Sequence, residues 1–193
     1  MTRFHVEFRD IKPSGIQSWL EAQTNPDDPG IKRRAIELKT ILFDGQCEYV
    51  VEPYKYLWES ARCYILGYYL ATISLCSATV EHTWNHDPKL AIVEMPRRNR
   101  GWITLNQNNL IECHNQGLPV EELLSENEQS QIPNFTSVPK FIDIRNKIDH
   151  GEIEAYLQGF PIPHYSQQAE QEAKEQILKC NNYFVKWANQ VCR

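Results

Sequence analysis

The sequence lacks the short motifs that commonly mark a cofactor site or a nucleophile. It has no Gly-rich phosphate loop, no GxSxG elbow, no HExxH zinc motif and no CxxC pair. Internal repeats and low-complexity tracts are also absent. These absences argue against the common nucleotide-binding, serine-hydrolase and zinc-protease classes, and we expect no cofactor and no metal.

An excess of basic charge is missing as well. The chain has 20 Lys and Arg residues against 25 Asp and Glu residues, a formal net charge of −5. Such a balance argues against nucleic-acid binding through the whole surface, although a local basic site is compatible with it. The start, MTRFHVEFRD, has charges and no apolar core region, so no secretory signal is expected. The six cysteines are then expected to be reduced, mostly buried thiols of a cytoplasmic protein.

One uncharged run, from Cys63 to Val80, is near the lower length limit for a membrane span. It contains three tyrosines and several Ser and Thr residues, and no second such run occurs. A helix buried on nearly all sides explains the run better than a membrane span.

The 193 residues suit a single domain, residues 1–193. Helical signals dominate residues 53–193, starting at Pro53, which suits a first helical turn, and running to about Asn85. The final helix has Ser166 as its N-cap and an apolar stripe at steps of three and four, formed by Ala173, Ile177, Cys180, Phe184, Trp187 and Val191. We therefore predict an all-α helical bundle around a long central helix, Pro53–Asn85.

Residues 1–52 form an N-terminal extension whose pattern is ambiguous. The alternation in RFHVEF and the Asp44-Gly45 pair between apolar runs predict a small β element. The spacing of Ile31, Ala35, Leu38 and Leu42 fits a helix equally well.

The stretch PKFIDIRNKIDHG, residues 139–151, combines core packing with functional side chains. At about 100° per residue, Phe141, Ile144 and Ile148 share the side that faces the core. Asn146 and His150 share another side, and Arg145 borders the apolar face. Gly151 ends the helix and leaves His150 at the negative end of its dipole.

An ordinary surface interpretation competes with a functional one. Arg145 can pair with Asp149, and Asp143 with Lys147, across one helical turn. His150 can simply cap free carbonyl groups of the helix end.

The segment RNKIDHG, which follows an apolar run and precedes the last long helix, resembles the Arg-x4-His signature of the HEPN superfamily. The resemblance covers residues 53–193 and implies a helical bundle that acts as a metal-independent endoribonuclease. It also implies a homodimer with an RNA substrate, often a toxin paired with an antitoxin or a component of antiviral defence against phage. Arg145, Asn146 and His150 are the catalytic residues that it implies. A catalytically inactive module that binds nucleotide, nucleic acid or a partner protein is the alternative.

The chain departs from the resemblance at one position. Some toxins of this superfamily carry a tyrosine two residues after the histidine, which an antitoxin modifies. Here that position is Glu152, and the nearest downstream tyrosine is Tyr156, so this mode of regulation is in doubt.

RNA cleavage without a metal needs these side-chain types. A histidine that titrates near neutrality can take or give the proton, and an arginine offers a fork of donors that matches phosphate oxygens. One histidine does not conveniently perform both proton transfers, whereas a two-fold dimer supplies a second.

Other residues are weaker candidates. Arg97, Arg98 and Arg100 lie beside Trp102, a basic cluster with an aromatic ring that could contact RNA, although a solvated loop is the simpler interpretation. Glu81 could point from the central helix toward the motif. His82 and His86 have a spacing that could ligate a metal, although capping of the helix end is the simpler interpretation.

Overall fold

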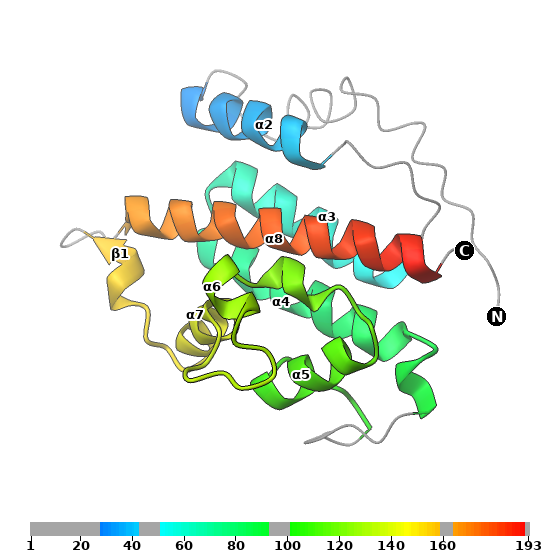
Figure 1. Ribbon diagram of the computed structural model, residues 1–193. Helices are drawn as coiled ribbons and strands as arrows, with labels where there is room; N and C mark the ends of the chain where they lie inside the picture. The colour runs from blue at the N-terminus through cyan, green and yellow to red at the C-terminus, as the bar shows by residue number, and fades with distance from the viewer. Residues whose placement is uncertain (1–27, 43–50, 93–100, 159–163, 192–193) are drawn as a thin grey trace.

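The computed structural model describes residues 28–42, 51–92, 101–158 and 164–191, and these residues form an all-α helical bundle (Figure 1). The predicted fold class is therefore confirmed. The α-helices are α2 (Pro29–Leu42), α3 (Val51–Leu66), α4 (Tyr69–His86), α5 (Gln107–Asn115), α6 (Glu126–Gln129), α7 (Lys140–Asp149) and α8 (Gln167–Val191). Short 3-10 helices lie between them: η2 (Leu90–Ile92), η3 (Val120–Leu123) and η4 (Glu154–Tyr156).

The prediction of one continuous helix from Pro53 to Asn85 is wrong, because α3 and α4 are separate helices packed against each other. Gly67 ends α3 with a φ of +84°, a left-handed conformation that glycine adopts without steric cost. The Gly67 N–H donates to the Tyr64 carbonyl (3.0 Å) and the Tyr68 N–H to that of Cys63 (2.8 Å). This pair of bonds is a Schellman motif, which satisfies carbonyls that a helix end leaves open.

The same break interrupts the uncharged run Cys63–Val80. Among the described residues, no helix combines the length and the apolarity that a membrane crossing needs.

Helix α4 lies at the centre of the bundle and packs against α3 and α8 (Figure 1). The large aromatic side chains Trp84, Tyr183 and Trp187 are fully buried between these helices. The polar atoms of Tyr183 and Trp187 are paired: the Thr83 and Tyr183 hydroxyls are 2.8 Å apart, and the Trp187 indole N–H donates to Asp87 Oδ2 at 2.8 Å. Full burial of one such side chain contributes about 1.5–3 kcal/mol, so this contact is a main source of stability.

The last helix agrees closely with its prediction. Ser166 is its N-cap, because the Ser166 Oγ accepts a hydrogen bond from the Ala169 N–H at 3.2 Å. The predicted stripe faces the core: all its members are buried except Val191, which packs against the core at its edge.

The described part of the N-terminal extension is helical. Asp28 Oδ1 accepts hydrogen bonds from the N–H groups of Gly30 (2.7 Å) and Ile31 (3.1 Å), and Pro29 occupies the first turn of α2. Helix α2 packs on α3 and α8, so the helical interpretation of residues 31–42 is confirmed. The predicted β element at RFHVEF and Asp44-Gly45 lies outside the described residues.

The strands that the structure describes lie elsewhere. β1 (Leu157–Gln158) pairs antiparallel with β2 (His164–Tyr165), just before α8.

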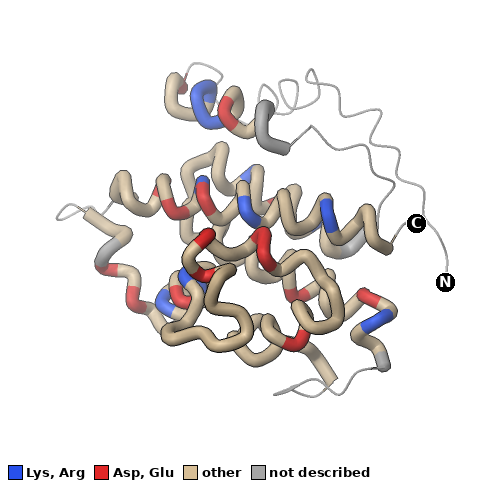
Figure 2. Tube along the Cα trace, in the orientation of Figure 1, with Lys and Arg blue, Asp and Glu red and all other residues tan. Residues whose placement is uncertain are grey.

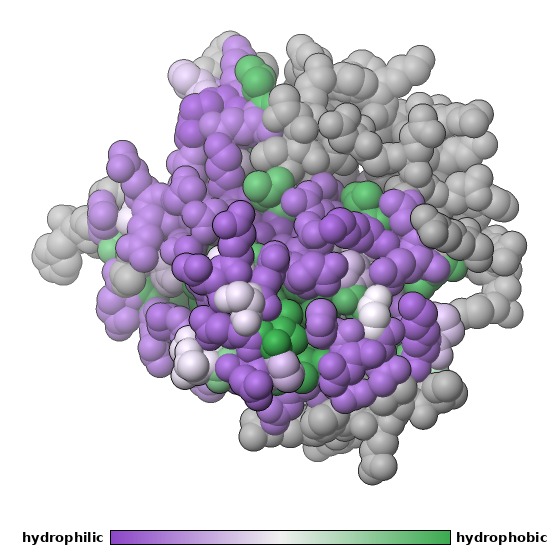
Figure 3. All heavy atoms as spheres, in the orientation of Figure 1, coloured by the Kyte–Doolittle hydropathy of each residue, from purple (hydrophilic) through white to green (hydrophobic). Residues whose placement is uncertain are grey.

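The described cysteines Cys63, Cys76, Cys113 and Cys180 are free, and all but Cys63 are buried. The face of the molecule seen in Figure 3 is largely hydrophilic, with hydrophobic atoms in small patches. Positive and negative residues are interspersed along the helices, as Figure 2 shows, in keeping with the modest net charge.

Candidate functional site

Helix α7 presents the predicted motif because its two faces differ in polarity. Phe141, Ile142 and Ile144 are buried in the core, and Ile148 packs at the core's edge. Gly151, with a φ of +77°, ends the helix, and its N–H donates to the Ile148 carbonyl (3.1 Å). The polar residues of the motif are therefore placed on the outer side of the helix and at its C-terminal end.

Arg145 contacts three oxygen acceptors. Its Nη1 donates to the Asn146 Oδ1 (3.1 Å), its Nη2 to the Glu81 Oε1 (3.3 Å), and its Nε pairs with Asp149 Oδ2 (2.8 Å). The side chain is 26% exposed, so the guanidinium lies at the surface but is held in one direction. The Arg145–Asp149 pair expected from the sequence is present, as is the Asp143–Lys147 pair at 2.6 Å.

Glu81 connects α4 to this cluster. Its Oε1 accepts the Arg145 guanidinium and also the Leu105 N–H, at 2.7 Å. With two donors on one oxygen, the carboxylate is fixed in place. Glu81 therefore lies against the motif.

His150 lies at the C-cap of α7 and is exposed. Its backbone N–H donates to the Asn146 carbonyl at 2.9 Å, and within the described residues its imidazole makes no hydrogen bond. The Asn146 amide oxygen accepts from Arg145. Within one protomer the Asn146 amide oxygen therefore contacts the Arg145 guanidinium rather than the His150 imidazole.

His82, the residue that follows Glu81 in α4, lies in a cluster of aromatic rings. Tyr56 stacks on His82 with ring centroids 4.2 Å apart, and His86 stacks on His82 at 5.8 Å. Trp102 meets His82 nearly edge-on, at 4.9 Å and 73°. Of the proposed RNA-contacting residues, Trp102 is described and 37% exposed. Arg97, Arg98 and Arg100 lie outside the described residues.

The geometry of His82 and His86 does not favour a metal centre. The two rings are nearly parallel, at 18°, and His86 Nδ1 bonds the His82 carbonyl at 2.7 Å. In the part of the chain that the structure describes, no three His, Cys, Asp or Glu side chains are grouped to hold a metal ion.

Cys113 does not serve as a thiolate. The residue is fully buried, and burial raises the pKa of its thiol well above the ordinary value.

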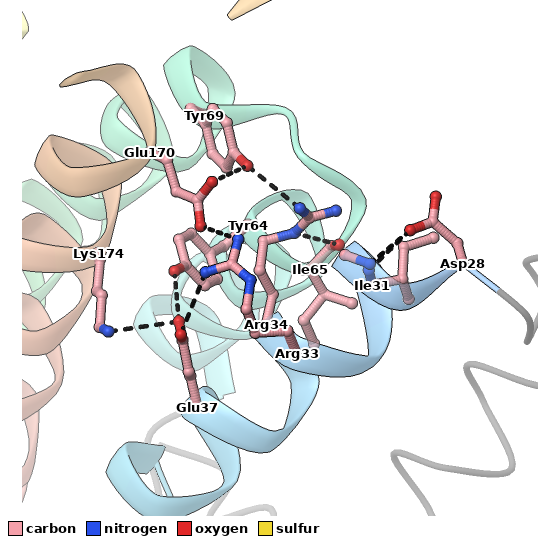
Figure 4. Close-up of polar contacts among 11 residues, drawn as sticks. Asp28, Ile31, Arg33, Arg34, Glu37, Tyr64, Ile65, Tyr69, Glu170 and Lys174 are labelled. Carbon is pink, nitrogen blue, oxygen red and sulfur yellow. Dashed lines mark hydrogen bonds and ion pairs between the residues drawn. The ribbon is translucent and has the colours of Figure 1, made fainter. Parts of the chain in front are cut away.

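A pocket of about 450 Å³ opens between α2 and α8, away from the motif. It is lined by Arg33, Glu37, Gln167, Glu170, Gln171 and Lys174. Figure 4 shows that its charged side chains face each other in pairs, with Arg33 between Glu37 and Glu170, and Lys174 on Glu37. The charges compensate each other across the helix–helix contact, so we interpret this cluster as the means by which α2 is docked.

Two contributors to the motif region had no clear signal in the sequence. Asn85 bonds both the N–H and the carbonyl of Ile103, at 2.8 Å each, and thereby holds residues 102–105 along α4. Tyr56 enters the ring cluster from α3. Both depend on tertiary contacts between segments that are distant in sequence.

Comparison with protein-family models, with curated protein sequences and with solved structures finds no match to this chain.

Proposed function

We propose that this protein is a metal-independent endoribonuclease of the HEPN type that acts as a homodimer. The observation that carries the proposal is the α7 C-terminal end, where a fixed arginine and an exposed histidine lie within one and a half turns of each other. Arg145 and His150 would be catalytic, and Asn146 would support the guanidinium. The HEPN resemblance adds a setting for this activity: a cytoplasmic toxin or phage-defence component, with an antitoxin or a neighbouring defence protein as partner.

The reaction needs one bond formed and one broken. A base removes the proton of the RNA 2′-hydroxyl, the 2′-oxygen attacks the adjacent phosphorus, and the 5′-oxygen leaves after an acid protonates it. An imidazole can act as base or acid near neutral pH. The guanidinium offers two parallel N–H donors to the phosphate, where negative charge grows in the transition state.

The contacts of Arg145 are compatible with this role because one of them is weak. Asp149 is 43% exposed, and exposed pairs one helical turn apart contribute only about 0.3–0.5 kcal/mol. A phosphate that binds the guanidinium through two hydrogen bonds interacts more strongly and can displace Asp149. Glu81, at 15% exposure and with the Leu105 N–H on the same oxygen, would remain and hold the side chain.

Two protomers are proposed because each provides one exposed imidazole in the motif. A two-fold axis near His150 would bring the second imidazole to the opposite side of the same phosphate, so that one acts as base and the other as acid. The same axis would place two guanidinium groups along the RNA strand.

A catalytically inactive binding module is the second candidate, and one observation favours it. Arg145 is already paired with two carboxylates, Glu81 and Asp149, which lowers the positive potential offered to RNA. In such a module the motif would bind a nucleotide, a nucleic acid or a partner protein without cleaving it.

The test is RNA cleavage by the purified protein in EDTA, with any co-purifying partner removed and with varied single-stranded and structured RNAs. His150→Ala should lower the cleavage rate by about 10²–10⁴-fold, the usual contribution of acid–base catalysis. Lys147→Ala, on the same helix, is the matched control and should retain the wild-type rate.

Because His150 is exposed, its replacement should leave the circular dichroism spectrum and the oligomeric state unchanged. A wild-type dimer that cleaves none of these RNAs would overturn the nuclease and leave the binding module.

A further inference from the structure

The ring cluster formed by Tyr56, His82, His86 and Trp102 has an exposed side. His86 is exposed, and Trp102 is 37% exposed, while Tyr56 and His82 lie deeper. His82 contacts both outer rings, by stacking on His86 at 5.8 Å and edge-on at Trp102 at 4.9 Å, and Tyr56 stacks on His82 at 4.2 Å. The outer aromatic surfaces are therefore supported from behind.

The backbone next to Trp102 is fixed. The Asn85 amide bonds both backbone groups of Ile103 at 2.8 Å, and Glu81 accepts the Leu105 N–H at 2.7 Å. Three side-chain hydrogen bonds from α4 thus hold the segment that begins at Trp102. A ring held in this way loses little further freedom when it binds a ligand.

The cluster adjoins the α7 motif. Glu81 Oε1 accepts both the Arg145 guanidinium and the Leu105 N–H, and Leu105 lies three residues after Trp102 on the fixed segment. A nucleic-acid strand with a phosphate at Arg145 therefore has aromatic surface close beside it. Aromatic rings that stack bases beside a cation that binds phosphates are the usual elements of a single-strand site.

We propose that Trp102 and His86 form a platform on which unpaired bases of a single-stranded nucleic acid stack. His86 lies at 18° and Trp102 at 73° to His82, so each ring takes a separate base, with His82 as the support of both rings and Tyr56 stacked on His82. The identification of the strand as the RNA substrate rests on the proposed nuclease function; the stacking itself does not. Every base has an aromatic face, so stacking does not select for one sequence. Bases in a duplex are already stacked on each other, so the platform selects for single strands. His86 Nδ1 must carry its proton because it bonds a carbonyl oxygen, which fixes the ring beside the backbone of α4.

The probe is a fluorescently labelled single-stranded DNA of about 12 nucleotides, within the usual site sizes. It lacks the 2′-hydroxyl and cannot be cleaved by the proposed reaction. Fluorescence anisotropy with the full chain should show that Trp102→Ala weakens binding about 5- to 100-fold, the usual effect of losing one stacked base. His86→Ala should act in the same direction, and Trp102→Phe should restore most of the affinity.

Two controls separate stacking from charge and from folding. Tyr68→Ala removes an aromatic side chain that is 55% exposed at the opposite end of α4, and it should bind like the wild type. An oligonucleotide with abasic sites keeps its phosphates and should bind as weakly to the wild type as the normal strand binds to Trp102→Ala. Urea midpoints of the variants verify that each one folds, and His86→Ala tests the platform even if Trp102→Ala does not fold.

The outcomes distinguish this inference from the proposed function. Equal affinities of the wild type, His86→Ala and Trp102→Ala for the probe, or equal binding of normal and abasic strands, would overturn the platform whether or not RNA is cleaved. Absence of any binding to the single strand would also overturn it. Binding that is weakened by Trp102→Ala and His86→Ala, in a protein that does not cleave RNA, would support the platform and contradict only the proposed nuclease activity.

Discussion

Two clusters of charged side chains in this molecule contain an arginine between carboxylates, yet they differ in what surrounds the arginine. In the docking cluster, Arg33 of α2 meets Glu37 and Glu170, and the tyrosines Tyr64 and Tyr69 donate to the same two carboxylates (Figure 4). In the α7 cluster, Arg145 meets Glu81 and Asp149, and an exposed histidine with no hydrogen bond to the described residues ends the same helix.

The difference shows how a charged contact that joins two helices can be distinguished from one whose side chains can bind a ligand and take part in a reaction. The docking cluster has cations, anions and hydroxyl donors that are satisfied by each other, so nothing in it requires a ligand. The α7 cluster combines one fixed acceptor, Glu81, one exposed acceptor, Asp149, and an imidazole open to solvent. A phosphate can enter the second cluster by replacing one weak contact.

The largest expected effect tests the two arginines against each other. Arg145→Ala should lower RNA cleavage about 10²–10³-fold, because it removes donors to the charge that grows on the phosphate. Arg145→Lys should recover little of the rate, since an ammonium lacks the planar fork. Single-turnover cleavage in EDTA is the measurement, with Arg33→Ala as the matched control at the wild-type rate. Comparable losses in both variants would remove the distinction between the clusters.

The next effect concerns the hydroxyl that completes the docking cluster. Tyr69 donates to Glu170 Oε2 at 2.9 Å, so Tyr69→Phe should lower the free energy of unfolding by about 1–2 kcal/mol near pH 8. Burial, followed by the bond to Glu170, raises the pKa of Tyr69 to about 12 from its ordinary 10. The stability that this group provides is therefore complete below pH 10 and is lost as the pH rises through about 12.

Urea unfolding at several pH values checks this expectation. The difference between the wild type and Tyr69→Phe should shrink between pH 10 and pH 12. Tyr68→Phe, at a neighbouring exposed position, should change neither the stability nor its pH dependence. A wild-type advantage over Tyr69→Phe that grows with alkaline pH would contradict the role assigned to the hydroxyl.

The smallest effect is expected from the surface side of the same cluster. Arg33 is 52% exposed, and removing its pairs by Arg33→Ala should cost only about 0.5 kcal/mol of stability. The loss should diminish as salt is raised from 0.05 M to 0.5 M, because exposed pairs are screened. Thermal unfolding at both salt concentrations measures it, and a loss of several kcal/mol that salt does not change would show that Arg33 holds α2 by other means.

Much of the helical architecture could be predicted because its signals are local. The stripe of α8 and its Ser166 cap need only the spacing of residues along one helix, and so do the end of α7 at Gly151 and the Arg145–Asp149 pair. Gly67 is a local signal for a helix end, and the prediction of one continuous helix from Pro53 to Asn85 does not use it. A glycine after Leu66 is a typical helix terminator, but the uncharged residues on both sides of it suggested one continuous helix.

The rest of the candidate site could not be read from the sequence because it depends on contacts between distant segments. The Asn85–Ile103 and Tyr56–His82 contacts arise only when α3, α4 and the segment after Trp102 are packed together. Asn146 was expected near His150 because four residues separate them on the helix. In the structure the Asn146 amide oxygen instead accepts a hydrogen bond from the guanidinium of the adjacent Arg145.

The buried bonds from α4 to α8 bear on how the chain is made. The partners Asp87 and Trp187, like Thr83 and Tyr183, are 100 residues apart. At about 5–20 residues per second, a ribosome needs on the order of 5–20 s to synthesise the intervening chain. During that interval the nascent polypeptide carries an uncovered flank of α4, and this is the stage at which a chaperone would have the most to bind.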